Sequence, residues 1–338
     1  MKILLTGGTG YIGSHTAVEL IEAGHELTLI DNFSNSKPTV LDRLKEITGK
    51  EIDFFQIDVT DEAALDGLME QRSFDAVIHL AAPKAVEESV RRPLHYYLNG
   101  VGGTVALCRA MDRHDIRNLV YSSSATVYGI PESLPVTEES PLSVINPYGR
   151  TKLMCEEILQ DLHRADNRWN IIALRYFNPV GAHSSGRIGE DPEGTPRNLM
   201  PYVAQVAVGR RAVLEVYGDD YETRDGTPIR DYLHVVDLAA GHVAALEHLG
   251  RTAGYDVFNL GTGSGVTVLE LVDAFATAAG REVPYRIVGR RAGDATEIWA
   301  DCSKAERELA WRASRSIAEM CADSWKWQES NPEGFPDA

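Results

Sequence analysis

Short apolar runs alternate with longer amphipathic stretches along the first half of the chain. The runs that are bounded by turn residues and rich in apolar side chains are residues 3–5, 27–30, 52–57, 76–80, 119–122 and 171–175. Runs of this length predict strands, and their apolar character suits a parallel sheet that is covered on both faces. Helical periodicity between the runs therefore predicts an α/β fold with a doubly wound parallel sheet.

The length of the chain indicates two lobes. It has 338 residues, and a single hydrophobic core stops growing at roughly 250–300 residues. Glycines and prolines gather between residues 181 and 196, directly after Phe177. We therefore expect a first lobe over 1–177 and a smaller α/β lobe over 178–338, with a segment near 234–260 returning to the first lobe.

Several predicted helices begin with local capping signals. These are Thr60 before Asp61 and Glu62, Asn146 before Pro147, and the capping boxes Thr267-x-x-Glu270 and Ser316-x-x-Glu319. Side-chain oxygens at these positions satisfy free amides of a first helical turn, and proline fits the first helical position. Beyond the lobe boundary near Phe177 we also expect strands at residues 213–217 and 256–260.

The charge balance limits the possible partners. The chain has 33 Lys and Arg against 50 Asp and Glu, a net charge of −17, which repels nucleic acid. An anionic ligand would need the few basic side chains concentrated at its site, and we expect Arg175, Arg230 and Arg291 to serve this purpose.

The cysteines and the apolar runs bear on metal binding and location. The four cysteines form no CxxC pair and have no histidine at metal-ligand spacing, so we expect reduced thiols and no metal site. No apolar run approaches the length of a signal peptide or of a membrane span. These observations predict a soluble cytoplasmic protein that does not bind membranes.

A glycine-rich turn, GGTGYIG at residues 7–13, follows the first predicted strand. Gly7 allows the tight turn, Gly10 lets backbone amides approach a pyrophosphate, and Gly13 lets the following helix pack closely on the strand. The second strand ends in Asp31, 18 residues past Gly13, where a carboxylate can bind the adenosine ribose hydroxyls. The same carboxylate would repel a 2′-phosphate, so this Rossmann pattern predicts NAD rather than NADP.

Further residues at strand ends fit the cofactor hypothesis. Asp58 and Val59 follow the third strand and are placed to hold the adenine, although a solvated surface aspartate explains Asp58 equally well. Leu80, Ala81 and Lys84 follow the fourth strand and are expected to line the nicotinamide side.

A second glycine cluster occurs at Gly261-Thr-Gly263-Ser-Gly265, again between a predicted strand and a helix. It lacks the third glycine at the required spacing, and no strand that ends in an acidic residue follows it. We therefore interpret this cluster as a turn and not as a second nucleotide site.

Tyr148 and Lys152 form a candidate catalytic pair, because residues four apart lie on one helical face. Ser124 closes a serine run at the end of the fifth strand, where a doubly wound sheet binds its ligand. A tyrosine is phenolate in only about one molecule in a thousand at pH 7, and lowering its pKa by about three units requires roughly 4 kcal/mol. Lys152 and the positive nicotinamide ring can supply interaction of this size, which would make Tyr148 a general base.

The same three residue types could also occur together without any catalytic role. A surface helix with a Tyr–Lys contact, next to a serine-rich strand end, would give the same local pattern. We favour catalysis because the pattern occurs together with the glycine turn and Asp31. In the catalytic hypothesis Ser124 hydrogen-bonds the substrate oxygen and shares the proton with Tyr148.

These motifs resemble those of the extended short-chain dehydrogenases/reductases, on the evidence of GGTGYIG, Asp31-Asn32, SSSATVYG and Tyr148-x-x-x-Lys152. The resemblance extends to the UDP-glucose 4-epimerase family over essentially the whole chain, through RYFNPVGA at 175–182, GEDP at 189–192, NLMPYVAQVAVGRR at 198–211, RDYLHVVDLAAGHV at 230–243 and RRAGD at 290–294.

The resemblance implies reversible inversion at C4 of UDP-galactose and UDP-glucose, through a transient 4-keto sugar. It implies a first lobe that holds NAD tightly and a second lobe that binds the UDP-sugar. It also implies a homodimer formed through the helices near residues 94–113 and 148–164.

Additional cofactor contacts are expected from Tyr11, Ile12, Asn32, Asn99, Ser122 and Tyr176. Substrate contacts are implied for Ser124, Tyr148, Asn178, Asn198, Leu199, Tyr217, Arg230, Arg291, Asp294 and Ile298, with Arg230 and Arg291 on the diphosphate.

The chain departs from the family pattern at three positions. Pro83 lacks an amide that might have faced the cofactor, and Arg197 replaces a small polar residue. Ile298 stands where tyrosine usually closes the hexose pocket. Because isoleucine is smaller than tyrosine, we expect secondary activity on UDP-N-acetylglucosamine.

Two rival functions are kept open. A nucleotide-sugar 4,6-dehydratase needs an acid–base carboxylate pair beside the serine run, but these positions hold Ala125 and Thr126. A non-catalytic dinucleotide sensor would have no reason to retain Tyr148, Lys152 and Ser124 together.

Overall fold

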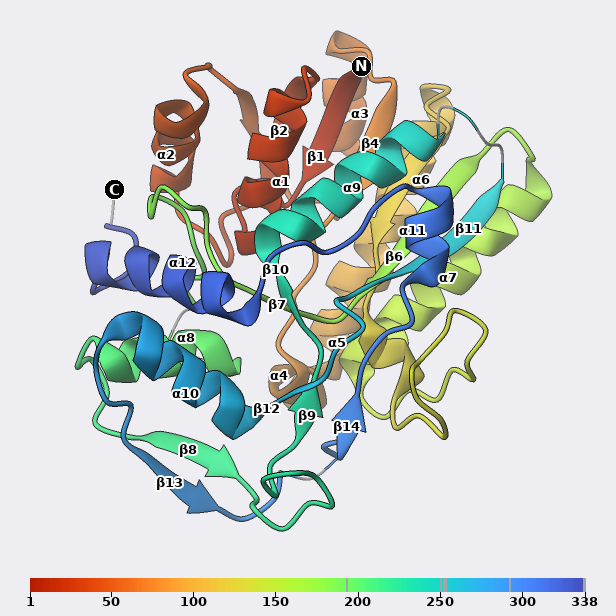
Figure 1. Cartoon of the computed structure of the whole chain (residues 1–338). Helices are drawn as coiled ribbons and strands as arrows, with labels where there is room; N and C mark the ends of the chain where they lie inside the picture. Colours follow the sequence, from red (N-terminus) through yellow and green to blue (C-terminus); the bar gives the residue numbers. More distant parts are fainter. Residues whose placement is uncertain (193, 250, 252–253, 292, 337–338) are drawn as a thin grey trace.

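A seven-stranded sheet forms the centre of the computed structural model, which describes residues 1–192, 194–249, 251, 254–291 and 293–336 (Figure 1). The strands lie in the order β11-β6-β5-β4-β1-β2-β3, and every neighbouring pair is parallel. Their bounds are β1 Lys2–Thr6, β2 Glu26–Asp31, β3 Asp53–Gln56, β4 Ala76–His79, β5 Asn118–Ser122, β6 Asn170–Tyr176 and β11 Tyr255–Leu260. The doubly wound α/β fold predicted from the apolar runs is confirmed.

Helices pack on both faces of this sheet, and alternate residues of β1 show why its sequence is apolar throughout. Ile3 and Leu5 belong to one buried cluster, whereas Leu4 belongs to another on the opposite face. The first cluster includes side chains of α1 Tyr11–Glu22, α2 Thr39–Thr48 and α9 Val235–Leu249. The second includes side chains of α3 Glu62–Gln71, α6 Gly103–Arg113 and α7 Pro147–Ala165.

Short helical elements follow the carboxyl ends of β4 and β5. After β4 the chain forms α4 Val86–Arg91, α5 Pro93–Tyr96 and a π-helix, η1 Tyr97–Gly102, which continues directly into α6. After β5 it forms a short 3₁₀ helix, η2 Ala125–Tyr128. Irregular turns of the π type occur most often at functional sites.

The second lobe has its own hydrophobic core. Its elements are α8 Leu199–Ala207, β8 Leu214–Tyr217, α10 Val268–Ala279, β13 Tyr285–Val288 and α12 Ile317–Ser330 (Figure 1). Very short strands join the lobes, with β7 Asn178–Val180 parallel to β10 Tyr232–His234, and β9 Ile229–Arg230 lying between β12 Val266–Thr267 and β14 Glu297–Ile298. Helix α11 Ser303–Glu308 packs back against the first lobe.

The capping predictions are confirmed at three helices and wrong at one. Asn146 caps α7 by accepting a hydrogen bond from the Gly149 amide at 2.8 Å, and both capping boxes are present. Thr60 does not cap α3, because its hydroxyl donates to Asp58 Oδ1 at 2.6 Å. Asp61 caps that helix instead by accepting from the Ala64 amide at 3.0 Å.

Among the described residues, no helix is both long enough and apolar enough to cross a membrane.

Candidate active site

The glycine turn between β1 and α1 leaves no room for side chains at two of its glycines. Gly7 has φ +69°, and a Cβ there would lie 2.9 Å from the Ala81 amide nitrogen. A Cβ on Gly13 would lie 2.0 Å from the Gly7 carbonyl oxygen. No side chain caps α1 at Gly10, so the helix N-terminus remains available to an anion. The turn therefore fits the pyrophosphate of a dinucleotide.

Asp31 lies at the end of β2 beside this turn, and its side chain is held by several hydrogen bonds. Oδ2 accepts from the Thr9 amide at 3.2 Å, while Oδ1 accepts from the Phe33 amide at 2.9 Å and the Ser36 hydroxyl at 3.1 Å. The residue is 9% exposed. These bonds orient the carboxylate before any ligand arrives.

Asp58 lies two residues past the end of β3, and hydrogen bonds hold both of its carboxylate oxygens. Its Oδ2 accepts from Asn32 Nδ2 at 2.8 Å, and its Oδ1 accepts from the amide of Thr60 at 2.8 Å. Burial alone would raise the pKa of Asp58, but hydrogen bonds from Thr60 and Asn32 outweigh it and lower the pKa. Val59, which follows it, is buried against Gly103 of α6.

Residues after β4 connect the glycine turn to the second lobe. The amides of Leu80 and Ala81 both donate to Thr6 Oγ1 at 3.2 Å. The Lys84 ammonium pairs with Glu190 Oε1 at 2.6 Å and lies 5.4 Å from the centre of the Tyr11 ring.

Two further contacts cross between the lobes near this point. The Tyr11 hydroxyl donates to the Gly181 carbonyl at 2.7 Å. Arg197, on the exposed surface, pairs with Glu87 of α4. Nothing in the structure explains why Pro83 occupies the loop between β4 and α4.

The π-helix η1 carries Asn99, whose Nδ2 donates to the His95 carbonyl at 2.8 Å. Gly100 sits against α7, because a Cβ there would lie 3.2 Å from Thr151 Cβ. The π-helix thus packs directly on the helix that carries Tyr148 and Lys152.

The three predicted catalytic side chains come together at the carboxyl end of β5. Tyr148 lies in the first turn of α7 and is 7% exposed, and the Ser124 side chain is close enough to lower the pKa of its phenol. Lys152 donates from Nζ to the Ser122 carbonyl at 2.7 Å, and Nζ lies 5.9 Å from the centre of the Tyr148 ring. The hydroxyl of Ser122 donates to the Tyr176 hydroxyl at 3.0 Å.

The pKa values in this group differ in part from what the sequence predicts. Burial lowers the pKa of Lys152 to about 8. Burial also raises the pKa of Tyr148, although the Ser124 hydrogen bond lowers it in part. The protein alone therefore makes Tyr148 a weaker acid than a free phenol.

A buried ion pair beneath the catalytic group was missed by sequence reasoning. Glu156 and Arg175 have side chains that are 4% and 6% exposed, and Arg175 Nη2 lies 2.6 Å from Glu156 Oε2. The Ser123 hydroxyl donates to Glu156, which joins β5, α7 and β6. The expectation that Arg175 helps to bind an anionic ligand is wrong, because Glu156 neutralises it inside the protein. The available signal was the spacing of Tyr148, Lys152 and Glu156, which places all three on one face of α7.

The predicted substrate residues gather on short strands and loops of the second lobe. Arg230, at the end of β9, pairs with Asp294 at 3.0 Å. The Arg291 guanidinium lies 4.4 Å from the centre of the Tyr217 ring. Ile298 of β14 lies opposite Arg230 in the parallel β9–β14 register. Ala292, within the RRAGD motif, lies outside the described residues.

Three other predicted substrate residues are placed by β7 and α8. The Asn178 amide donates to the Asp231 carbonyl at 3.0 Å, and its side chain is exposed. Asn198 precedes Leu199 at the start of α8, and its Nδ2 donates to Glu190 Oε1 at 2.9 Å. Glu190 therefore contacts both Lys84, a predicted cofactor residue, and Asn198, a predicted substrate residue.

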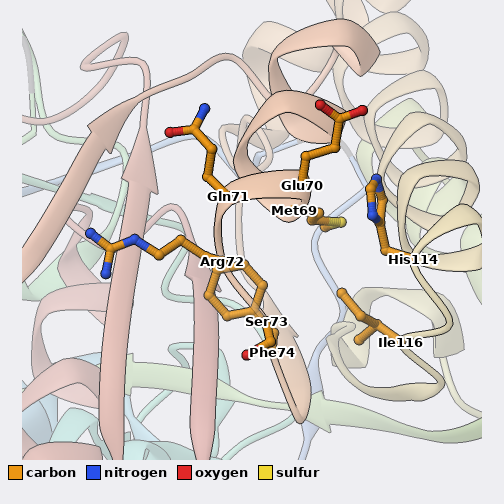
Figure 2. Close-up of a pocket in the computed structure, with 8 residues that line it drawn as sticks. All are labelled: Met69, Glu70, Gln71, Arg72, Ser73, Phe74, His114 and Ile116. Atoms are coloured by element: carbon orange, nitrogen blue, oxygen red, sulfur yellow. The ribbon is translucent and has the colours of Figure 1, made fainter.

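A surface hollow of about 220 Å³ lies away from these residues (Figure 2). It is lined by Met69, Glu70, Gln71, Arg72, Ser73, Phe74, His114 and Ile116. Most of these residues directly precede β4 or β5, so the hollow lies at the amino ends of strands whose carboxyl ends face Tyr148. We do not assign it to the substrate, because ligands of such sheets bind outside the carboxyl ends.

Comparison with known proteins defines the class of this chain. Residues 3–261 match the model of the NAD dependent epimerase/dehydratase family, and the chain belongs to that family.

Relatives of the whole chain narrow the class. The chain is 57% identical over 338 residues to the UDP-glucose 4-epimerase of Bacillus subtilis, with 100% of both covered. It is 52% identical over 341 residues to that of Homo sapiens, covering 99% of this chain and 98% of the relative. The crystal structure of UDP-glucose 4-epimerase from Bifidobacterium longum in complex with NAD+ and UDP is 50% identical, with a TM-score of 0.96 and coverage of 99% and 100%. Within the family, the chain groups with the UDP-glucose 4-epimerases.

Proposed function

We propose that this chain interconverts UDP-galactose and UDP-glucose by inversion at C4, with tightly bound NAD recycled in each turnover. The observation that carries the proposal is the meeting of Tyr148, Ser124 and Lys152 at the carboxyl end of β5. This group lies in the same sheet as the glycine turn and Asp31, in a chain 57% identical to the Bacillus subtilis epimerase.

Residues of the first lobe would hold the cofactor. The glycine turn over residues 7–13 would bind the pyrophosphate, Asp31 the ribose, and Asp58 with Val59 the adenine. The remaining proposed contacts are Tyr11, Ile12, Asn32, Leu80, Ala81, Lys84, Asn99, Ser122, Tyr148, Lys152 and Tyr176. When bound, NAD supplies a positive ring that accepts a hydride from C4 of the sugar and later returns it. We assign residues 1–177 and the returning segment 234–260 to this lobe, and the rest of 178–338 to the UDP-sugar lobe.

Proton transfer is the task of the catalytic side chains. Tyr148 would accept the proton of the sugar 4-hydroxyl, while the Ser124 hydroxyl holds the same oxygen by a hydrogen bond. The Lys152 ammonium, held in place by the Ser122 carbonyl, would add its positive charge to that of the nicotinamide ring in stabilising the phenolate. After the 4-keto sugar has rotated to present its other face, Tyr148 would return the proton to the oxygen at C4. Neither a proton nor an electron pair is gained or lost over the cycle.

The second lobe would bind the uridine diphosphate. Arg230 and Arg291 suit the two phosphates, because a guanidinium pairs with phosphate in a bidentate way. Asn178, Asn198, Leu199, Tyr217, Asp294 and Ile298 complete the proposed set. Binding of the uridine diphosphate, which is remote from C4, keeps the intermediate in the site while the sugar itself is held loosely enough to rotate.

The residues around Ile298 support a proposal for a second substrate. Ile298 is 9% exposed and packs in a small cluster with Ala125, Val127 and Phe177, so the space near it is set by aliphatic and aromatic side chains. We propose slower turnover of UDP-N-acetylglucosamine. The UDP-Glc/GlcNAc 4-epimerase of Campylobacter jejuni supports this, with 36% identity, a TM-score of 0.85 and coverage of 97% and 99%.

We further propose a cytoplasmic homodimer. Apolar side chains are exposed along α4, α5, η1, α6 and α7, among them Leu94 at 81% and Leu98 at 64%. Others are Val86, Val90, Val105 and Met154. An exposed apolar patch of this kind indicates an interface with a protein partner, and a second copy matches the family expectation. Light scattering should give the mass of a dimer, and L94K should give that of a monomer.

The function is tested by incubating purified protein with UDP-galactose and no added NAD. The epimerase proposal predicts UDP-glucose as product, together with NAD in the supernatant of the denatured protein. A 4,6-dehydratase would instead yield a 4-keto-6-deoxy sugar nucleotide, and a sensor would yield no product. Either of these results would refute the proposal.

A further inference from the structure

The second glycine cluster closes around an aspartate of the protein itself. Asp231 is 0% exposed, and its Oδ1 accepts hydrogen bonds from the Thr262 amide at 2.8 Å and the Thr262 hydroxyl at 2.6 Å. Its Oδ2 accepts from the Gly263 amide at 3.1 Å and the Ala300 amide at 3.1 Å. Successive backbone amides in a turn form a pocket for an anion. Here that anion is the carboxylate of Asp231, so the glycine cluster has a role within the protein itself.

The cluster is built to fit this carboxylate closely. A Cβ on Gly261 would lie 2.5 Å from Asp231 Oδ2 and 2.9 Å from Ala300 Cβ, so a side chain there would collide with both. Among the described residues, no basic side chain forms an ion pair with Asp231. A buried charge without an ionic partner is costly, and a packed apolar residue would usually stabilise the fold better. This cost indicates that the Asp231 carboxylate serves to position neighbouring residues.

Asp231 lies at the point where three proposed substrate contacts meet. It directly follows Arg230, and its own carbonyl accepts a hydrogen bond from the Asn178 amide at 3.0 Å. Its carboxylate holds Ala300, which comes two residues after Ile298. The β9–β14 pairing that places Ile298 opposite Arg230 involves only two residues on each strand. A ladder this short needs an additional contact to fix its register.

We propose that Asp231 is a positioning residue that holds Arg230 and Ile298 in register, and thereby sets both the affinity for the diphosphate and the selectivity for the hexose. The inference rests on the proposed function and deepens it. Asp231 touches neither substrate nor cofactor in this proposal, since it acts through the residues on either side of it.

The test is Asp231→Asn in the full-length protein. The amide keeps the size of the side chain, but in either orientation its NH₂ group faces backbone N–H donors, either that of Thr262 or those of Gly263 and Ala300. We expect the Kd of UDP, measured by titration calorimetry, to rise by about tenfold. The KM for UDP-galactose should rise similarly while kcat falls less, and the ratio of turnover on UDP-N-acetylglucosamine to UDP-galactose should change.

Asp237→Asn is the control for loss of a buried carboxylate elsewhere in the fold, and Asp237, unlike Asp231, also forms an ion pair with Arg315. Asp237 is also buried, and it accepts hydrogen bonds from Ser314 Oγ at 3.1 Å and from the amides of Ser314 at 3.0 Å and Arg315 at 2.9 Å. It joins α9 to the segment before α12 and contacts none of the proposed substrate residues. The control should lower Tm and leave the Kd of UDP unchanged per folded molecule.

The outcomes separate this inference from the proposed function. Thr262→Val, which removes one hydroxyl donor and keeps the backbone, should raise the Kd of UDP by about threefold, and it provides the test if Asp231→Asn does not fold. The inference is overturned if these variants bind UDP as the parent does, or if Asp237→Asn weakens UDP binding equally. If the parent protein itself fails to bind UDP, the proposed function fails and this inference falls with it.

Discussion

The two halves of the site are built differently. In the cofactor half, one strand–turn–helix segment supplies the glycines, and Asp31 is held by amides of Thr9 and Phe33. In the substrate half, side chains arrive from separate short elements and meet mainly each other, as in the Arg230–Asp294 pair and the contact of Arg291 with Tyr217.

This difference has an energetic consequence. Backbone contacts in a continuous sheet are present before ligand arrives, so little order remains to be gained when the cofactor binds. In the other half, under the proposed function, the guanidinium groups of Arg230 and Arg291 would have to rearrange their present contacts with Asp294 and Tyr217 to bind phosphate. We therefore expect changes in the first half to alter chemistry and fold stability, and changes in the second to alter substrate affinity and selectivity.

The largest effect is expected from Tyr148→Phe, which removes the proposed base. The value of kcat should fall by about 10² to 10⁴-fold, because general base catalysis contributes on that scale. The Kd of UDP should stay the same, since the substrate half is untouched. Tyr232→Phe, at a buried tyrosine in the core of the second lobe, serves as a control for loss of a buried hydroxyl. Equal turnover by Tyr148→Phe and the parent would refute the mechanism.

Breaking an ion pair should cost more stability in the first half than in the second. Glu156→Gln leaves the Arg175 charge buried without its partner, and loss of about 3 kcal/mol of unfolding free energy is expected. Asp294→Asn breaks a pair whose side chains are 15% and 26% exposed, where about 1 kcal/mol or less is expected. Urea unfolding measures the free energy of unfolding of both variants. Similar losses in the two would contradict the expected difference between the buried and the partly exposed ion pair.

Low pH should destabilise the fold through buried histidines of the first lobe. Burial lowers the pKa of His15 and of His79 to about 3 and that of His242 to about 4, and these residues lie on α1, β4 and α9. Below about pH 6.5 the unfolded chain binds protons at these histidines that the folded chain does not, so stability falls as pH drops toward the folded pKa values.

At pH 5 each of these histidines should cost about 2 kcal/mol relative to pH 7.5. Urea midpoints across this range provide the measurement. Unchanged midpoints from pH 7.5 to 5 would show that the three imidazoles are not buried in the neutral form.

Of the two variants expected to change turnover, Ile298→Tyr should have the smaller effect. The larger ring in Ile298→Tyr should lower turnover of UDP-N-acetylglucosamine by about tenfold, while UDP-galactose turnover changes little, because pocket size discriminates by this amount. Parallel assays with both sugar nucleotides measure the ratio. An unchanged ratio would mean that this side chain does not limit the hexose pocket.

Sequence patterns predict the fold and the site correctly where the spacing of neighbouring residues determines their geometry. The glycine turn, Asp31 and the α7 pair Tyr148 and Lys152 each lie within one strand–turn–helix unit or one helix, so their arrangement follows from backbone geometry. The six apolar runs predicted the first six strands because both faces of this sheet are buried.

The remaining features depend on contacts between distant segments. Strands β7, β9, β12 and β14 have two or three residues each, too few to show periodicity. The partners of Arg175 and of Asp231 lie 19 and 31 residues away, in Glu156 and Thr262. The helical spacing places Glu156 on the same face as Tyr148, but no local pattern pairs it with Arg175 or pairs Thr262 with Asp231. Thr60 was misassigned as a cap because its hydroxyl binds Asp58, which precedes it in the chain.

The path of the chain limits how the enzyme releases its product. The polypeptide passes from the sheet into the second lobe after β6, returns through α9 and β11, leaves again at Gly261 and returns once more at α11 (Figure 1). Several covalent tethers thus run between the two bodies, and a wide hinge opening would strain all of them at once. We expect exchange of sugar nucleotides to depend on small displacements of surface side chains and loops, and the lobes to unfold together in one cooperative transition.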